Sequence, residues 1–125
     1  MTKPKTIRQL KKELWKWFSL FIRQRDGYKC VTCGKYAEGS GMHAGHYITK
    51  AAGGLALYFH ENNVHAQCFR CNIHLSGNWS KYRDFILEKY GEAVDKELMR
   101  LRYVVLKWTT KDYEEKINHY KSLVK

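Results

Sequence analysis

The sequence lacks a long apolar run, and it has a single proline among its 125 residues. No stretch approaches the roughly 20 apolar residues that a membrane-spanning helix needs. The first apolar cluster, residues 14–22, is interrupted by Lys16 and precedes no small-residue cleavage site, so we expect no signal peptide. Repeats, low-complexity tracts and linkers are also missing. We therefore expect a cytoplasmic protein of one domain, residues 1–125, that does not enter a membrane.

Acidic residues are scarce: 12 Asp and Glu accompany 23 Lys and Arg, which gives a net charge of +11. Residues 1–29 carry nine basic and two acidic side chains, residues 30–78 carry three and two, and residues 79–125 carry eleven and eight. This distribution predicts that the N-terminal flank binds a polyanion and that chemistry takes place in the nearly neutral centre. The alternatives are a merely basic domain and a domain that binds an anionic membrane surface.

The N-terminal flank, residues 6–25, predicts a basic amphipathic helix. Thr6 and Gln9 fit a capping box at its start, and Asp26 with Gly27 marks its end. Its basic side chains are the ones expected to contact DNA phosphates: Lys11, Lys12, Lys16, Arg23 and Arg25.

Because 44% of the residues are hydrophobic, the chain can form a core and is not expected to be disordered. The order of its expected strands and helices predicts an α+β fold that is mostly helical. Residues 42–48 predict one strand, and residues 55–59 predict a second strand after the Gly53-Gly54 turn. A helix is expected to follow, which gives a ββα core within residues 30–78. Residues 79–125 predict two or three supporting helices, with Gly91 as a C-cap and Thr109 with Asp112 as an N-cap.

The four cysteines form two Cys-x-x-Cys pairs, Cys30/Cys33 and Cys68/Cys71. Thiols stay reduced in the cytosol, and four thiolates suit a tetrahedral structural Zn²⁺. The 34 residues between the pairs exceed the length of a compact zinc ribbon, so this segment is expected to hold structure of its own. A thioredoxin-like redox role is disfavoured because neither pair lies in a βαβ pattern.

The central segment also carries residues suited to phosphodiester hydrolysis. That reaction needs a base that activates water, a cation that stabilises the leaving oxygen, and a group that holds the base in one tautomer. An imidazole suits the first role, and oxygen and imidazole ligands suit Mg²⁺ or Mn²⁺. The residues that can fill these roles are His46, His43 with Asn72, and Asn63.

The order of these motifs resembles the zinc-bearing HNH endonucleases over residues 30–72: Cys-x-x-Cys, Gly-His, Gly-Gly, then Asn five residues before Cys-x-x-Cys-Asn. More narrowly, RQRD at 23–26, HAGHY at 43–47, NVHAQC at 63–68 and SGN at 76–78 are similar to the phage recombination protein NinG (Rap) family. The zinc-and-asparagine arrangement also resembles endonuclease VII-type junction resolvases. These resemblances imply a phage-encoded enzyme that works in the cytoplasm of the host bacterium.

The resemblance to HNH nucleases implies a role for each matching residue. His46 corresponds to the general base, and Asn63 to the residue that orients it. Asn72 corresponds to a ligand of the catalytic Mg²⁺ or Mn²⁺. The structural zinc ligands would be the four cysteines: Cys30, Cys33, Cys68 and Cys71.

One position departs from the pattern, because many HNH proteins carry a metal-binding Asp where this chain has Gly45. On a strand His43 lies on the same side as position 45, so we expect it to replace the missing ligand. His65 is a third candidate ligand for the catalytic ion. The competing interpretation is a degenerate, inactive site.

We therefore expect an HNH-type, structure-specific DNA endonuclease that cuts branched recombination intermediates such as Holliday junctions or D-loops. A homodimer would suit paired cuts in opposite strands. The alternatives are a non-catalytic zinc-dependent DNA-binding module, a treble-clef adaptor in recombination or packaging, and a homing-type or restriction-type nuclease. The last would need sequence readout, for which 125 residues show no separate recognition domain.

Overall fold

The structure is a computed structural model that describes residues 3–125. The elements follow in the order α1 (Ile7–Arg25), the 3-10 turn η1 (Gly39–Gly41), β1 (Met42–His46), α2 (Leu55–Tyr58), β2 (Val64–Cys68), the π-helical turn η2 (Arg70–His74), α3 (Trp79–Tyr90), α4 (Glu92–Leu101) and α5 (Thr110–Leu123). The predicted class, α+β and mostly helical, is confirmed. Within residues 3–125, no helix has the length and apolar character that crossing a bilayer demands.

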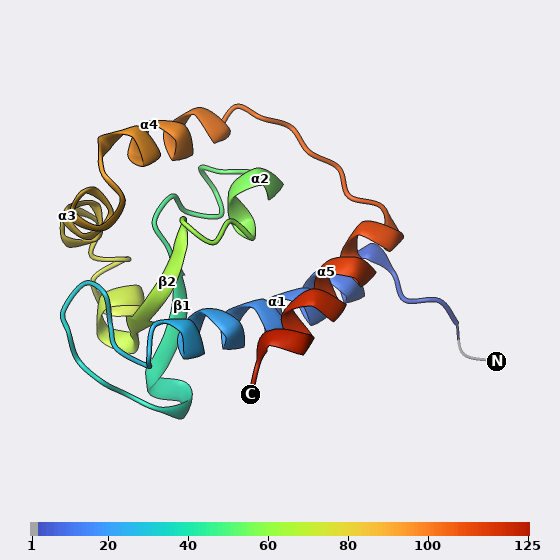
Figure 1. Cartoon of the computed structure of the whole chain (residues 1–125), viewed down its shortest axis with the longest axis horizontal. Helices are drawn as coiled ribbons and strands as arrows, with labels where there is room; N and C mark the ends of the chain where they lie inside the picture. The colour runs from blue at the N-terminus through green and yellow to red at the C-terminus, as the bar shows by residue number, and fades with distance from the viewer. Residues whose placement is uncertain (1–2) are drawn as a thin grey trace.

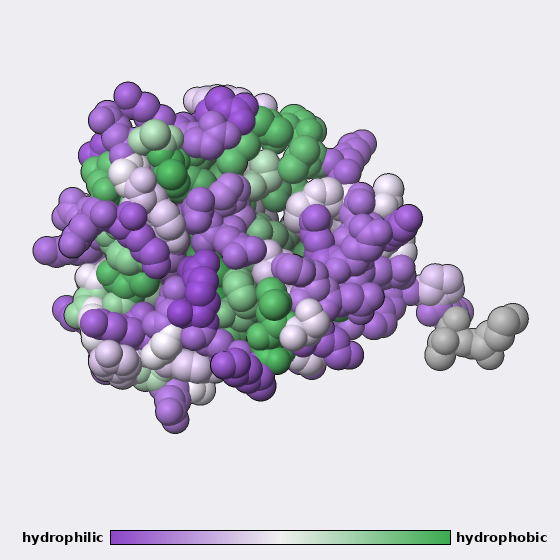
Figure 2. Space-filling model, viewed as in Figure 1, coloured by the Kyte–Doolittle hydropathy of each residue, from purple (hydrophilic) through white to green (hydrophobic). Residues whose placement is uncertain are grey.

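The β1–β2 hairpin lies between two helical layers, with α1 and α5 side by side on one side and α3 and α4 on the other (Figure 1). Each layer buries its own apolar cluster, the first against the hairpin and the second against the segment after β1 and α2. The first includes Leu14, Phe18, Ala44, Val64, Tyr113 and Ile117. The second includes Tyr47, Ile48, Leu57, Tyr82, Ile86 and Leu98. Hydrophilic side chains cover most of the visible face, and the exposed hydrophobic ones form separate patches (Figure 2).

Helix α1 begins and ends as its sequence predicts. The Thr6 hydroxyl accepts from the Gln9 backbone N–H, and the Gln9 side chain accepts from the Thr6 N–H, which completes the capping box. At the other end Asp26 caps the helix and its carboxylate accepts a hydrogen bond from the Ala66 N–H at 2.8 Å. The end of α1 is thereby attached to β2.

The second strand is not where the apolar run predicts it. Residues 55–58 form the short helix α2, whereas β2 is Val64–Cys68 and pairs antiparallel with β1 in the register Met42↔Cys68 and Gly45↔His65. A five-residue apolar run fits a strand or a helical turn equally well. The choice is tertiary, because pairing Val64–Cys68 with β1 brings the second cysteine pair beside the first.

The C-terminal predictions are confirmed in their main features. Three helices follow the core, and Gly91 ends α3 with a φ of 89°, a value that glycine adopts without strain. Thr109 and Asp112 form a complete capping box at the start of α5.

His65 joins the hairpin to α3 and is fully buried. Its Nδ1 lies 3.1 Å from the Tyr82 hydroxyl, and its Nε2 lies 2.7 Å from the Tyr90 hydroxyl. The Tyr82 hydroxyl donates to the Gly45 carbonyl, so it accepts from Nδ1–H of His65. Both ring nitrogens are therefore used within the fold. The expectation that His65 binds the catalytic ion is corrected accordingly, and we assign it a structural role.

The buried His65 predicts a loss of stability in acid. Burial, together with the positive charge of Arg25, lowers the pKa of His65 to about 3. The unfolded chain takes up this proton below about pH 6.5, so the free energy of unfolding is highest above that pH. It should fall by about 1.4 kcal/mol per pH unit for each such histidine as the pH drops toward 3.

The test is urea unfolding at several pH values between 5 and 7, with zinc present. The His65→Gln variant should lose one histidine's share of the pH slope, because glutamine does not titrate. The matched control is His119→Gln, on an exposed residue of α5, and it should keep the wild-type slope. An unchanged slope in His65→Gln would contradict the assignment.

Candidate functional site

The two cysteine pairs meet at one end of the hairpin. Cys30 lies in a tight turn in which its N–H donates to the Lys35 carbonyl at 2.8 Å, and Val31 bonds the Ala66 carbonyl of β2 at 3.0 Å. Cys68 ends β2, and Cys71 lies in η2. The four sulfur atoms consequently lie within 4.8 Å of one another.

This cysteine cluster fits a structural zinc ion. A tetrahedral site with Zn–S distances of about 2.3 Å needs sulfur atoms about 3.8 Å apart, and the Sγ atoms of Cys33 and Cys68 are 3.7 Å apart. Three of the four cysteines are buried, which suits a site closed to solvent. A closed set of four thiolates has no open coordination position, so zinc here stabilises structure and performs no chemistry.

His46 lies at the other end of β1, against α1 and α2. Its ring stacks on Trp15, with ring centroids 5.2 Å apart and planes 15° apart. Its Nε2 lies 2.9 Å from the Tyr58 carbonyl oxygen. A carbonyl can only accept, so Nε2 carries the proton and Nδ1 keeps its lone pair. This is the tautomer in which Nδ1 can act as a base.

The environment of His46 also keeps the ring neutral. The pKa of His46 is lowered to about 4, chiefly by burial and also by the positive charge of Lys50, although the hydrogen bond to the Tyr58 carbonyl acts in the opposite direction. His46 is therefore unprotonated at neutral pH and able to accept a proton.

Asn63 holds the loop that carries the partner of His46. It is fully buried, accepts from the Ile48 N–H at 2.8 Å, and donates to the Ile48 and Leu57 carbonyls at 3.1 Å each. Leu57 precedes Tyr58, whose carbonyl fixes the His46 ring. Asn63 does not touch His46 directly, and its role is that of a positioning residue.

His43 and Asn72 lie together, as expected, but their side chains bind each other. His43 Nε2 donates to the Ser40 carbonyl at 3.2 Å, which leaves Nδ1 to accept from the Asn72 side-chain amide at 3.0 Å. Both ring nitrogens of His43 are occupied, so His43 orients Asn72 and does not present a free metal ligand. The expectation that His43 replaces the missing carboxylate is corrected on this ground.

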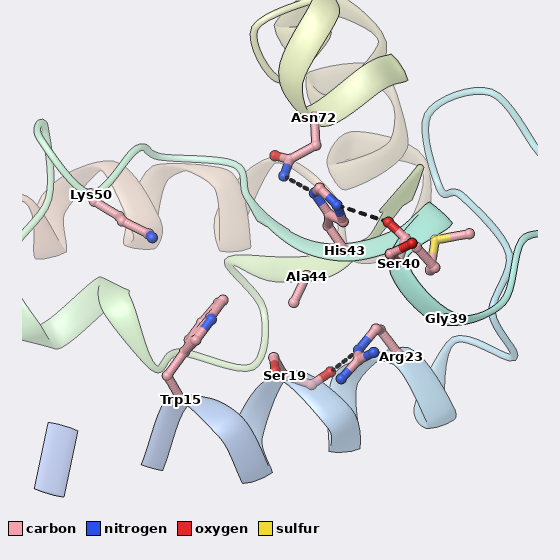
Figure 3. Close-up of a pocket in the computed structure, with 10 residues that line it drawn as sticks. Trp15, Ser19, Arg23, Gly39, Ser40, His43, Ala44, Lys50 and Asn72 are labelled. Carbon is pink, nitrogen blue, oxygen red and sulfur yellow. Dashed lines mark hydrogen bonds between the residues drawn. The ribbon is translucent and has the colours of Figure 1, made fainter. Parts of the chain in front are cut away.

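Two hollows flank Asn72. One, of about 440 Å³, lies between α1 and β1 and is lined by Trp15, Ser19, Arg23, His43, Lys50 and Asn72, among others (Figure 3). The other, of about 280 Å³, is lined by His46, Lys50, Asn72, Gly77 and Trp79, among others. Lys50 and Asn72 belong to both, so the histidines and two basic side chains face connected concave surfaces.

The basic residues predicted to bind DNA separate into two groups. Arg23 lines the larger hollow, Lys11 lies 4.3 Å above the Tyr58 ring, and Lys12 and Lys16 are exposed. Arg25 is different, because it binds Asp26 and donates to the Glu61 and Val64 carbonyls. Arg25 is therefore removed from the DNA-binding set.

Sequence reasoning missed Lys50, Trp15 and Gln67. Lys50 and Trp15 come from segments far apart in the chain and meet only at the hollow, where the Lys50 ammonium lies 5.4 Å from the Trp15 ring centroid. No local motif marks either residue. Gln67 does lie within the NVHAQC motif, two residues after His65 and four after Asn63, and this alternate spacing was the available signal.

The fold and the site together define a small α+β protein with a Cys₄ zinc-type cluster beside a histidine–asparagine hollow. The chain belongs to the NinG family, because the family model described as Bacteriophage Lambda NinG protein matches residues 1–125. It is 40% identical over 93 residues to Protein ninG of Salmonella phage P22, and 46% identical over 77 residues to Protein ninG of Escherichia phage lambda.

These matches cover 74% and 60% of this chain but only 44% and 37% of the two phage proteins. The chain thus spans less than half the length of the curated relatives that it matches. No solved structure matches it.

Zinc removal should unfold the core. Structural zinc sites contribute about 10 kcal/mol or more at neutral pH, which is comparable with the whole stability of a small domain. Purified protein should hold one zinc per chain by elemental analysis, and the Cys68→Ala variant should lose both the zinc and the cooperative thermal transition. Chelated wild-type protein should recover when zinc is returned. A metal-free Cys68→Ala protein with the wild-type transition would contradict the assignment.

Loss of the Asn63 side chain should be costly because it leaves the backbone N–H and carbonyl of Ile48 without their hydrogen-bond partner and removes one of the donors to the Leu57 carbonyl. We expect Asn63→Ala to lower the free energy of unfolding by about 2–4 kcal/mol. The matched control is Asn62→Ala, because the Asn62 side chain makes no hydrogen bond to any residue in 3–125, and the change should cost less than about 0.5 kcal/mol. Equal effects in urea unfolding would contradict the positioning role.

Proposed function

We propose that this chain is a metal-dependent DNA endonuclease of the HNH type that hydrolyses phosphodiester bonds in branched recombination intermediates. The observation that carries the proposal is His46. Its Nε2 is fixed on the Tyr58 carbonyl, its pKa is low enough to keep it neutral, and it lines a hollow with Lys50 and Asn72. A general base must be unprotonated and held in one tautomer before it accepts a proton, and His46 meets both requirements.

Basic side chains supply the binding of DNA in this proposal. Lys50 and Arg23 line the hollows, and Lys11, Lys12 and Lys16 extend the positive surface along α1. They hold phosphates electrostatically, so binding weakens steeply as salt concentration rises.

The proposed reaction uses His46 as the base. Its Nδ1 takes a proton from a water molecule, and the water oxygen attacks the phosphorus in line with the departing 3′ oxygen. Lys50 and Arg23 hold the phosphate for this attack. A Mg²⁺ or Mn²⁺ ion held at the Asn72 side of the hollow would offset charge on the phosphate and the leaving oxygen.

The preference for branched DNA rests on the resemblance to junction nucleases and on membership of the NinG family. Paired cuts across a junction need two active sites, so we propose that a homodimer acts on this substrate.

The second candidate is a non-catalytic zinc-dependent DNA-binding or recombination adaptor module. One observation favours it: within residues 3–125, the four cysteines form the one cluster of three or more His, Cys, Asp or Glu ligands. The hollow beside His46 has no carboxylate among its lining residues. This candidate predicts DNA binding without cutting in any metal.

The deciding experiment is a cleavage assay with zinc-loaded wild-type and His46→Ala proteins. The substrates are a four-way junction and a matched linear duplex, with Mg²⁺, Mn²⁺ or chelator. We expect the junction to be cut only with the divalent ion, and His46→Ala to lose about 100-fold or more of the rate, as for removal of a general base.

The matched control is His119→Ala on α5, which should cut like the wild type. Zinc content and thermal midpoint check that each variant is folded. Equal cutting of the linear duplex would retain the chemistry and remove the junction preference. Binding without cutting in every metal would favour the adaptor.

A further inference from the structure

Gly45 leaves a space on β1 that a side chain from β2 fills. A Cβ atom at position 45 would lie 2.0 Å from Oε1 of Gln67, far closer than two such atoms can approach. It would also lie 3.1 Å from Oδ1 of Asn72. Gly45 is therefore the residue that permits Gln67 to extend to this point, next to Asn72.

The Gln67 side chain can have only one orientation here. Its Nε2 donates to the Gly77 carbonyl at 2.8 Å, with the Thr32 hydroxyl at 3.3 Å. A carbonyl needs a donor, so the nitrogen faces Gly77 and Oε1 faces the space at Gly45. Gln67 is fully buried, and within residues 3–125 its Oε1 is the buried side-chain oxygen or nitrogen atom that lacks a hydrogen-bond partner. Such an atom is costly to leave unpaired.

The Asn72 side chain presents a second oxygen to the same point. Its amide nitrogen donates to His43 Nδ1, which turns Oδ1 away from His43 (Figure 3). This oxygen lies 3.1 Å from the position that a Cβ atom would have at Gly45. Because both oxygens lie close to the Cβ position of Gly45, they can be at most about 5 Å apart. Two acceptor oxygens that lie this close can both be satisfied by one hydrogen-bond donor or one cation between them.

We propose that Gln67 Oε1 and Asn72 Oδ1 form a divalent-cation site beside His46, with Gln67 in place of the carboxylate that Gly45 lacks. This inference rests on the proposed nuclease function and names the residues that hold its cation. Uncharged oxygen ligands suit hard cations such as Mg²⁺ and Mn²⁺.

The neutral ligands have a consequence for affinity. The two amides bring no negative charge, and Lys50 lines the same hollow, so the protein alone binds a divalent ion weakly. A DNA phosphate supplies the missing charge and further oxygen ligands. Cation and DNA therefore bind cooperatively, and each raises the affinity of the other by the same factor.

The experiment measures Mn²⁺ binding to zinc-loaded protein by electron paramagnetic resonance of the free ion, without DNA and with a four-way junction. A His46→Ala background keeps the DNA intact. We expect the junction to tighten Mn²⁺ binding. Gln67→Met, which keeps the length but removes the oxygen, should weaken Mn²⁺ binding in the presence of DNA by about tenfold or more, as expected for loss of a ligand.

A second variant tests the site without changing Gln67. Gly45→Ala places a Cβ where Gln67 Oε1 lies and should displace that oxygen, with a similar loss of Mn²⁺ affinity. Asn62→Ala, which removes an amide outside the site, should bind Mn²⁺ like the parent protein. Zinc content and thermal midpoint establish that each variant is folded, and Gly45→Ala decides if Gln67→Met does not fold.

The outcomes separate this inference from the nuclease proposal. Unchanged Mn²⁺ binding in both variants would mean that the space holds only a water molecule, and it would overturn the cation site even if the wild type cuts DNA. Weakened Mn²⁺ binding in a protein that never cuts DNA would support the cation site and reject the nuclease.

Discussion

The side chain of Asn63 is the interaction on which the candidate site depends. Its three hydrogen bonds join the end of β1, the helix α2 and the start of β2. The loop between the strands has little regular structure beyond α2, and this amide adds hydrogen bonds that fix it to the segment just after β1. One carbonyl of this loop, that of Tyr58, sets the tautomer of His46. A single buried amide thus helps to hold the loop whose Tyr58 carbonyl accepts a hydrogen bond from His46.

The hairpin itself is too short to be stable alone, and two-stranded ribbons of this size are at best marginal in water. It is held at one end by the cysteine cluster and along its faces by α1 and α3. The Asp26 carboxylate attaches α1 to β2, and the Tyr82 and Tyr90 hydroxyls attach α3 to His65. The site therefore lies on a rigid strand pair although most of its surroundings are turns.

The positively charged side chains and the neutral amide groups near Gly45 occupy different parts of this molecule. The positive residues lie along α1 and on the rim of the hollows, whereas the groups nearest Gly45 are neutral amides. The basic side chains around the hollows attract a phosphate, whereas the neutral amides of Gln67 and Asn72 alone attract a cation only weakly. The chain differs in this respect from the HNH pattern that it resembles, in which a carboxylate precedes the histidine. The absence of a side chain at position 45 and the extension of Gln67 into that space are two parts of one arrangement.

Local patterns in the sequence were sufficient for the helix boundaries at Thr6, Gly91 and Thr109, because caps and positive φ values depend on neighbouring residues alone. The Cys-x-x-Cys spacing of each cysteine pair was sufficient to predict that the two pairs share one metal ion. The identity of the second strand and the internal roles of Arg25, His43 and His65 were decided only by the tertiary structure. A short apolar run, a basic side chain or an imidazole has the same sequence signal whether it faces solvent, a metal or a buried hydroxyl. The approach of Gln67 to Gly45 was decided in the same way, since it depends on the register between two strands that are separated by 17 residues of chain, 47–63.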